Sequence, residues 1–384
     1  MSAINTIDTD VLRELLQRSD DMGVLTVYVD CPPIGDPQLE AAAIDLRNRF
    51  RELKRRLEND AVRSRFIPEL ERIWPHVAAV MQPPNAGKSH VLFSGLSDRW
   101  FAQFESPLQV NTRMVLDDGP FIHPLLELFD NGQPIGVVLV SSVGAQLLHW
   151  HLGSLDPIEE LTLEYTQASH ERAGQIGGGP PGQYHTPMRE QRQTREQTRM
   201  KRFVHDVAAS VEKNSAGRNW QRILVSAGQR WTDTMISALS PSLRSIAVAD
   251  SRDLNGLGRT ALNAAVTEFV HADNSQRQHG LLKQVGQAAQ TGTVAVGLAE
   301  VTAALNAGRA ANLIYDPGVR FTGYVTSEGT LYEHIPTDFE STAPDPRFTE
   351  RLVERALATG AKISPVSGAA QGELADGIAA ILRW

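Results

Sequence analysis

The sequence predicts a multidomain α/β protein, and three observations carry this expectation. A chain of 384 residues is longer than one ordinary core needs, and its 41% hydrophobic content is sufficient for several cores. Apolar segments with strand and helix patterns alternate along the chain. The turn residues Asp130-Asn131-Gly132 precede a new apolar run and mark a boundary. We therefore expect three domains, at residues 1–133, 134–272 and 273–384.

The first third has the pattern of an α/β domain. A helix at 10–18 and a strand at 24–29 begin it. The next helix has an apolar stripe with alternating spacings of four and three, formed by Leu39, Ala43, Leu46, Phe50, Leu53 and Leu57. A further helix around 67–74 and a strand at 90–95 follow. This alternation predicts helices packed on a sheet.

The middle third begins with three expected strands, at 135–140, 146–152 and 159–165. A Gly/Pro loop at 174–188 and a basic helix follow. After the helix we expect strand, helix, strand and helix, at 222–226, 232–239, 245–249 and 258–270. This order of elements predicts a layered, ribonuclease-H-like domain.

The last third predicts a compact α/β/α sandwich. Its expected helices are at 273–290, 297–307 and 348–359, and its expected strands are at 311–315 and 362–366. Gly308 and Gly360 follow two of these helices, where glycine commonly ends a helix.

The Gly/Pro loop and the helix after it form the main candidate site. The loop contains Gly177, Gly178, Gly179, Pro180, Pro181, Gly182, Gln183 and Tyr184. Its glycines permit close approach of the backbone to a partner, while its prolines limit collapse. The helix carries Arg189, Arg192, Arg195, Arg199, Lys201 and Arg202. Spacings of three, three and four place the four arginines on one face, a stripe that can follow a phosphate backbone. A solvated helix behind a linker is the alternative interpretation.

The charge distribution favours local contact with RNA. The net charge is −8, but residues 134–272 carry 14 Lys and Arg against 13 Asp and Glu. The acidic excess therefore lies outside the segment with the basic helix, which suits oriented docking rather than coating of RNA or binding of DNA. We expect no membrane span and no signal peptide. The single cysteine, Cys31, fits a cytoplasmic protein.

Several other motifs lead to weaker hypotheses. Ala86-Gly87-Lys88-Ser89 resembles the end of a phosphate-binding loop, but Gln82 stands where the first glycine is required. Residues 135–142 contain no carboxylate for two-metal nuclease chemistry. His149 and His151 flank Trp150 and have metal-ligand chemistry, but without a nearby third ligand a half-buried strand face is favoured. We expect no metal and no cofactor.

Four short motifs resemble one protein family. Gly360-Ala361-Lys362-Ile363 and the segment Gly377–Trp384 look like its closing "GAK…GIGAILRY" pattern, and Glu300–Gly308 looks like its "EV..AL..G" helix. Gln183, followed by the basic helix, is similar to its GGQ loop, and 84–87 resembles its "PxNG" turn. In this order across the chain, the motifs resemble the archaeal and eukaryotic class-one peptide release factor and Pelota family. The resemblance is to a divergent bacterial branch, which includes a ribosome hibernation factor.

The resemblance implies a factor that enters the ribosomal A site and contacts rRNA of both subunits. Its middle domain would reach the peptidyl transferase centre. Its C-terminal sandwich, similar to kink-turn-binding ribosomal proteins, would face a translational GTPase such as elongation factor Tu. In the first domain, the basic residues expected to contact rRNA are Arg47, Arg51, Lys54 and Arg55.

Two departures from the family pattern shape the functional hypothesis. The region around 55–65 lacks the Asn-Ile-Lys-Ser tip used to read stop codons. Pro181 precedes Gly182 and Gln183, and proline cannot adopt φ > 0 or donate an N–H. The leading hypothesis is a non-enzymatic factor that keeps ribosomes inactive under stress. Ribosome rescue or peptide release by peptidyl-tRNA hydrolysis through Gly182 and Gln183 is the alternative. An interaction protein unrelated to ribosomes is a third hypothesis.

Overall fold

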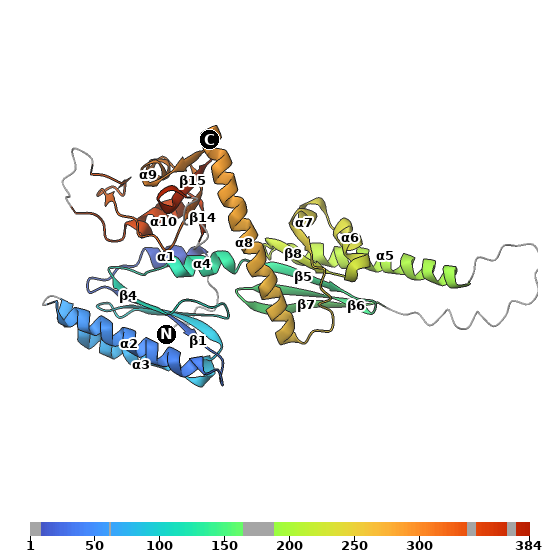
Figure 1. Cartoon of the computed structure of the whole chain (residues 1–384), viewed down its shortest axis with the longest axis horizontal. Helices are drawn as coiled ribbons and strands as arrows, with labels where there is room; N and C mark the ends of the chain where they lie inside the picture. Colours follow the sequence, from blue (N-terminus) through green and yellow to red (C-terminus); the bar gives the residue numbers. More distant parts are fainter. Residues whose placement is uncertain (1–8, 61–62, 164–187, 336–342, 367–373) are drawn as a thin grey trace, which may run out of the picture. The chain divides into compact units, whose positions relative to one another are not determined.

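The computed structural model describes residues 9–60, 63–163, 188–335, 343–366 and 374–384 (Figure 1). It is a multidomain, mixed α/β protein. The chain divides into two compact units, one formed by residues 1–132 together with 270–384, the other by residues 133–269. The division into three domains made from the sequence stays a prediction. None of the helices in the described residues is long and apolar enough to cross a membrane.

The N-terminal part of the first unit has helices on a four-stranded antiparallel sheet of order β3-β2-β1-β4. Its elements are α1 (Thr9–Leu16), β1 (Val24–Cys31), α2 (Gln38–Glu58), α3 (Ile67–Ala79), β2 (Lys88–Gly95), β3 (Phe101–Ser106), β4 (Arg113–Asp117) and α4 (His123–Asn131). Short 3-10 turns lie at Arg63–Phe66 and Pro83–Asn85. Leu46 and Phe50 of α2 and Leu70 of α3 pack on Leu25 and Val27 of β1 to form the core. Strands β3 and β4 and helix α4 were not predicted from the sequence.

The C-terminal part of the first unit has a second sheet, of order β10-β15-β11-β14. Its elements are β10 (Val294–Val296), α9 (Leu298–Asn306), β11 (Ala310–Tyr315), β12 (Tyr324–Val325), β13 (Leu331–Tyr332), α10 (Phe348–Ala358), β14 (Lys362–Pro365) and β15 (Ile378–Leu382), with a 3-10 turn at Ala375–Gly377. Only β11 and β14 pair in parallel. Gly308 and Gly360 follow α9 and α10 with φ of 65° and 70°, so both predicted helix ends have the left-handed residue that favours glycine.

Helix α8 corrects one expectation. The sequence analysis separated a helix at 258–270 from another at 273–290, but residues Arg259–Thr291 form one helix. No proline occurs in this segment, and no glycine interrupts it before Gly280, so nothing near Asp273 ends the helix. A boundary between residues 272 and 273 therefore falls within a continuous helix. The helix ends at Thr291, before Gly292 with φ of 69°.

The second unit is built on a five-stranded sheet of order β7-β6-β5-β8-β9. Its elements are β5 (Ile135–Val140), β6 (Gly144–His151), β7 (Ser154–Thr162), α5 (Met188–Ser215), β8 (Arg222–Ser226), α6 (Gly228–Ala238), α7 (Pro241–Ile246) and β9 (Ala247–Ala249). Strands β5, β6 and β7 are antiparallel, whereas β8 is parallel to both β5 and β9. The strand expected at 245–249 is shortened, because Pro241 begins helix α7, which extends to Ile246.

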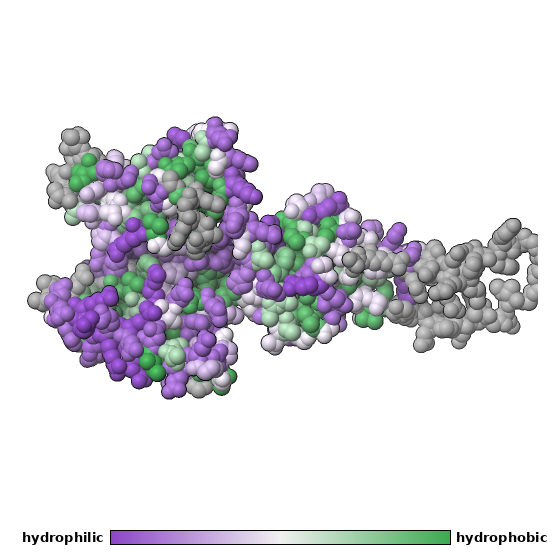
Figure 2. Space-filling model, in the orientation of Figure 1, coloured by the Kyte–Doolittle hydropathy of each residue, from purple (hydrophilic) through white to green (hydrophobic). Residues whose placement is uncertain are grey.

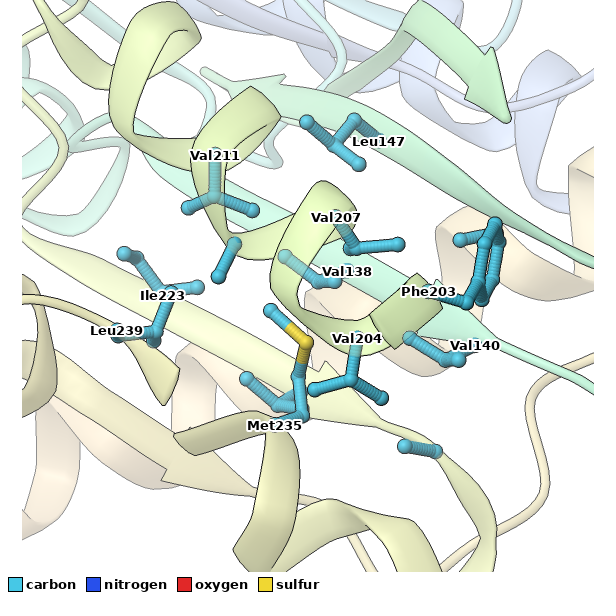
Figure 3. Close-up of a cluster of buried hydrophobic side chains, with 14 of the residues drawn as sticks. Val138, Val140, Leu147, Phe203, Val204, Val207, Val211, Ile223, Met235 and Leu239 are labelled. Carbon is cyan, nitrogen blue, oxygen red and sulfur yellow. The ribbon is translucent and has the colours of Figure 1, made fainter. Parts of the chain in front are cut away.

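The core of the second unit fixes helix α5 on this sheet (Figure 3). Val204, Val207 and Val211 of α5 are fully buried and point toward side chains of β5, β6 and β8. Met235 of α6 and Leu239 complete this cluster. Spacings of three and four put the buried valines on one face of α5, so the opposite face does not pack on the sheet.

Candidate functional site

The basic segment of α5 lies directly beside its buried face. Phe203 and Val204 are buried, whereas Lys201 and Arg202 are exposed, and Arg199 is half-buried. In Figure 1 the first turns of α5 extend past the strands of the sheet. The helix therefore presents the positive charges of Lys201 and Arg202 from a position held by hydrophobic packing.

A polar contact also ties the later part of α5 to the sheet. The Glu159 carboxylate of β7 accepts hydrogen bonds from Ser210 Oγ (2.5 Å) and Asn214 Nδ2 (2.8 Å). These two bonds lower the pKa of Glu159 from its ordinary value. The carboxylate thus stays ionised as an acceptor for α5, at the end of the helix remote from Lys201 and Arg202.

Part of the predicted site lies outside the described residues. This applies to Gly177, Gly178, Gly179, Pro180, Pro181, Gly182, Gln183 and Tyr184 of the loop. It also applies to the side chains of Arg189, Arg192 and Arg195, although these residues belong to helix α5. Their proposed contacts with RNA therefore stay predictions.

The four basic residues expected to contact rRNA on α2 have two different environments. Lys54 Nζ lies 2.5 Å from Glu71 Oε1, and Arg55 Nη2 lies 2.9 Å from Glu52 Oε2. The hydrogen bond from Arg55 is the main reason that the pKa of Glu52 is lowered. Arg47 and Arg51 are exposed and make no ion pair within the described residues. Only these two therefore present a charge that no carboxylate balances locally.

The surface around α2 and α3 is strongly hydrophilic on the face shown in Figure 2. Within it, Arg49 pairs with Asp45, and Arg56 pairs with Glu52. Arg49, Arg55 and Arg56 thus each lie beside an acid three or four residues away, with Glu52 shared by the last two. Exposed pairs of this kind are weak and are screened by salt.

A small pocket of about 270 Å³ lies in the second unit, at the turn between β5 and β6. Its lining includes Ser141, Gln146, Glu160, Thr162 and Asn255. The turn is closed by Ser141 Oγ, which donates to the Gly144 carbonyl oxygen at 3.0 Å. Asn255 Nδ2 donates to the Val140 carbonyl oxygen at 3.2 Å. This pocket was not predicted from the sequence, because its lining comes from the β5–β6 turn, from strands β6 and β7 and from Asn255, which share no motif.

The two histidines of β6 belong to a packed strand face. Their rings are stacked with centroids 6.0 Å apart, and Trp220 Nε1 donates to His149 Nδ1 at 3.0 Å. Burial lowers the pKa of both His149 and His151. In the described residues, no three His, Cys, Asp or Glu side chains gather to hold a metal ion.

Comparisons with known proteins give one family match. Residues 120–275 match the model of bacterial archaeo-eukaryotic release factor family 10. This range contains the Gly/Pro loop and all of α5. No curated protein matches the chain.

Solved structures similar to this chain include the following three. An archaeal translation termination factor, aRF1, is 18% identical, with 98% of this chain and 96% of that chain covered and a TM-score of 0.23. Pelota from Archaeoglobus fulgidus is 14% identical, with 77% and 79% covered and a TM-score of 0.33. Dom34 from S. cerevisiae, a translation termination-like factor, is 10% identical, with 77% and 79% covered and a TM-score of 0.40.

Proposed function

Because residues 120–275 match the model of bacterial archaeo-eukaryotic release factor family 10, we propose that this chain is a ribosome-associated translation factor. It occupies the ribosomal A site and keeps ribosomes inactive under stress, without hydrolysing peptidyl-tRNA. The observation that carries the proposal is the basic segment of α5. Exposed Lys201 and Arg202 stand on a helix whose other face is fixed in a core, within the part of the chain that matches the family.

The chemistry of α5 supports rRNA as the ligand. Contacts of Lys and Arg with phosphates set the position and orientation of a protein on RNA but do not read its sequence. A helix fixed by Val204, Val207 and Val211 offers such contacts without first having to become ordered. Arg47 and Arg51 of α2 supply a second basic surface, so the proposal includes rRNA of both subunits.

The loop sequence supports a non-hydrolytic role. Release of a peptide needs a glutamine amide held at hydrogen-bond distance from a water and the ester carbonyl, and a shift of about 1 Å can cost a hundredfold in rate. Pro181 directly before Gly182 and Gln183 fixes φ and removes an N–H donor. Peptidyl-tRNA hydrolysis through Gly182 and Gln183 is the second candidate, and the sequence Gly177-Gly178-Gly179 favours it, since glycine is not restricted to negative φ.

The proposal also includes a partner and a place in the cell. The partner of the C-terminal part is a translational GTPase such as elongation factor Tu, and the closing motif Gly377–Trp384 suggests it. The protein acts in the cytoplasm, with no membrane and no DNA partner.

Co-sedimentation of the full chain with ribosomes tests the proposal. The parent is compared with a double variant, Lys201→Glu and Arg202→Glu, over a range of salt concentrations. If both residues contact phosphates, the variant binds more weakly and its log–log salt slope is smaller by about 1.4–1.8. Lys213→Glu is the matched control, because Lys213 is an exposed lysine at the far end of the same helix. Equal binding and equal salt slopes in all three proteins contradict an RNA contact through this segment.

A further inference from the structure

A buried polar network joins the two sequence-distant parts of the first unit. His123 begins α4 and is 3% exposed. Its Nδ1 lies 3.0 Å from Tyr315 Oη at the end of β11, and its Nε2 lies 3.2 Å from Glu350 Oε1 on α10. Tyr315 and Glu350 are 1% and 6% exposed. One imidazole from residues 1–132 therefore bridges two buried polar groups of residues 270–384.

One tautomer of a neutral imidazole satisfies both partners. With the proton on Nε2, that N–H donates to the Glu350 carboxylate, and the lone pair of Nδ1 accepts the Tyr315 hydroxyl proton. The Phe121 ring stands edge-on to the His123 ring, with centroids 5.3 Å apart. Tyr28 Oη donates to the Phe121 carbonyl oxygen at 2.7 Å, which fixes this segment on β1. Contacts within residues 1–132 thus hold the His123 ring in position.

Further contacts near the network join residues 1–132 to residues 270–384 at this joint. The buried Arg347 guanidinium lies against Gly119, where an added Cβ would fall 2.1 Å from Arg347 Nη1. Any side chain at Gly119 would therefore displace Arg347. At the other end of α4, Asp130 Oδ2 lies 2.5 Å from Arg277 Nη2 of α8. Helix α4 is therefore held at both ends by polar contacts to residues 270–384.

The network lies among apolar contacts between the same two parts. Helix α1 contacts α10 and α4 contacts β14, and the leucines of α1 and α4 are buried. Apolar packing is not directional, whereas the hydrogen bonds of His123 are satisfied in one alignment only. We propose that His123 acts as a latch: its hydrogen bonds to Tyr315 and Glu350 fix α4 against β11 and α10, and their loss loosens α4 and α10 at this joint.

Amide hydrogen exchange of the full chain tests the latch. His123→Gln keeps a donor and an acceptor, whereas His123→Met removes both in a side chain of similar size. Exchange in α4 and α10 is expected to be at least about tenfold faster in His123→Met than in the parent. His123→Gln stays close to the parent. Peptides from β1 and β2, and from the second unit, keep the exchange of the parent in both variants.

Two further variants, compared with His123→Met, decide between a latch and a folding requirement. His271→Ala is the control, since His271 is an exposed histidine of α8, and it is expected to change nothing. Tyr315→Phe removes one hydroxyl and is expected to give a smaller increase confined to the same helices. Unchanged exchange in both His123→Met and Tyr315→Phe would overturn the proposal. Exchange that rises equally in β1 and β2 in both variants would overturn it as well, since His123 would then stabilise the whole part.

Discussion

The imidazole of His123 lies 3.2 Å from the carboxylate of Glu350, although 227 residues separate them in the sequence. Burial opposes ionisation of Glu350, but the hydrogen bond from His123, together with a backbone hydrogen bond and the charge of Arg347, outweighs it and lowers the pKa of Glu350. The ionised carboxylate is thus the form that this joint favours.

We expect acid to weaken the first unit through Glu350. A lowered pKa in the folded state means that its contribution is present above the ordinary glutamate pKa of about 4.3 and is lost as the pH falls below that value. The free energy of unfolding should therefore fall more steeply between about pH 5 and pH 3 in the parent than in Glu350→Gln. Urea unfolding at a series of pH values measures both slopes.

Other titrating groups near Glu350 set the control for this experiment. The pKa of Asp117 on β4 is raised, mainly by burial and also by the charge of Glu350, so its protonation favours the folded state as the pH falls. Asp117→Asn should therefore steepen the loss of stability in acid, opposite in sign to Glu350→Gln. The pKa of Tyr315 is raised, so its hydroxyl stays protonated in this range. Equal slopes of the free energy of unfolding against pH in the parent and Glu350→Gln would contradict a role of Glu350 in the acid sensitivity of the first unit.

Arg383 is expected to stabilise the C-terminal part by capping two helices. Its Nη1 donates to the Gly308 carbonyl oxygen (3.1 Å) after α9, and its Nη2 donates to the Thr359 carbonyl oxygen (2.8 Å) after α10. A cation at helix C-termini is also favoured by the helix dipoles. Arg383→Ala should lower the free energy of unfolding by about 1–2 kcal/mol. Arg383→Lys keeps the positive charge but not the two forked N–H donors, so its free energy of unfolding should lie between those of the parent and Arg383→Ala. Denaturant unfolding measures all three values.

The basic residues of α2 are expected to contribute unequally to ribosome binding. Arg47→Ala with Arg51→Ala should weaken binding and reduce the log–log salt slope by about 1.4–1.8, because these charges have no local carboxylate partner in the described residues. Lys54→Ala with Arg55→Ala should change the slope less, since Glu71 and Glu52 already offset these charges. Equal effects of the two double variants would show that the ion pairs of α2 do not restrict its binding surface.

Local patterns predicted much of the fold. The stripe ending at Leu57 became α2, and the glycines at 308 and 360 end α9 and α10 as expected. Strand β10 has only three residues, too few for a clear period, so it was not anticipated. Helix α8 was divided because a domain boundary was expected near Asp273, where the sequence contains no helix breaker.

The candidate site was only partly predictable. The arginine spacing of α5 is a local pattern, and it identified a basic helix directly. Which α2 charges are balanced depends partly on Glu71, which lies on another helix. The contacts of His123 depend on residues 192 and 227 positions away, so no spacing rule identifies them. Only the packing of the two parts brings these side chains together.

Peptide release from ribosomes carrying peptidyl-tRNA tests the central claim most directly. Purified full-length protein is incubated with such ribosomes, and both its co-sedimentation and the released peptide are followed over time, with Gln183→Ala alongside. The account predicts that both proteins bind and block elongation, while release stays at the rate without protein. Rapid release by the parent that is abolished by Gln183→Ala would contradict the non-hydrolytic function and favour rescue by hydrolysis. Failure of the parent to bind ribosomes would contradict ribosome association itself.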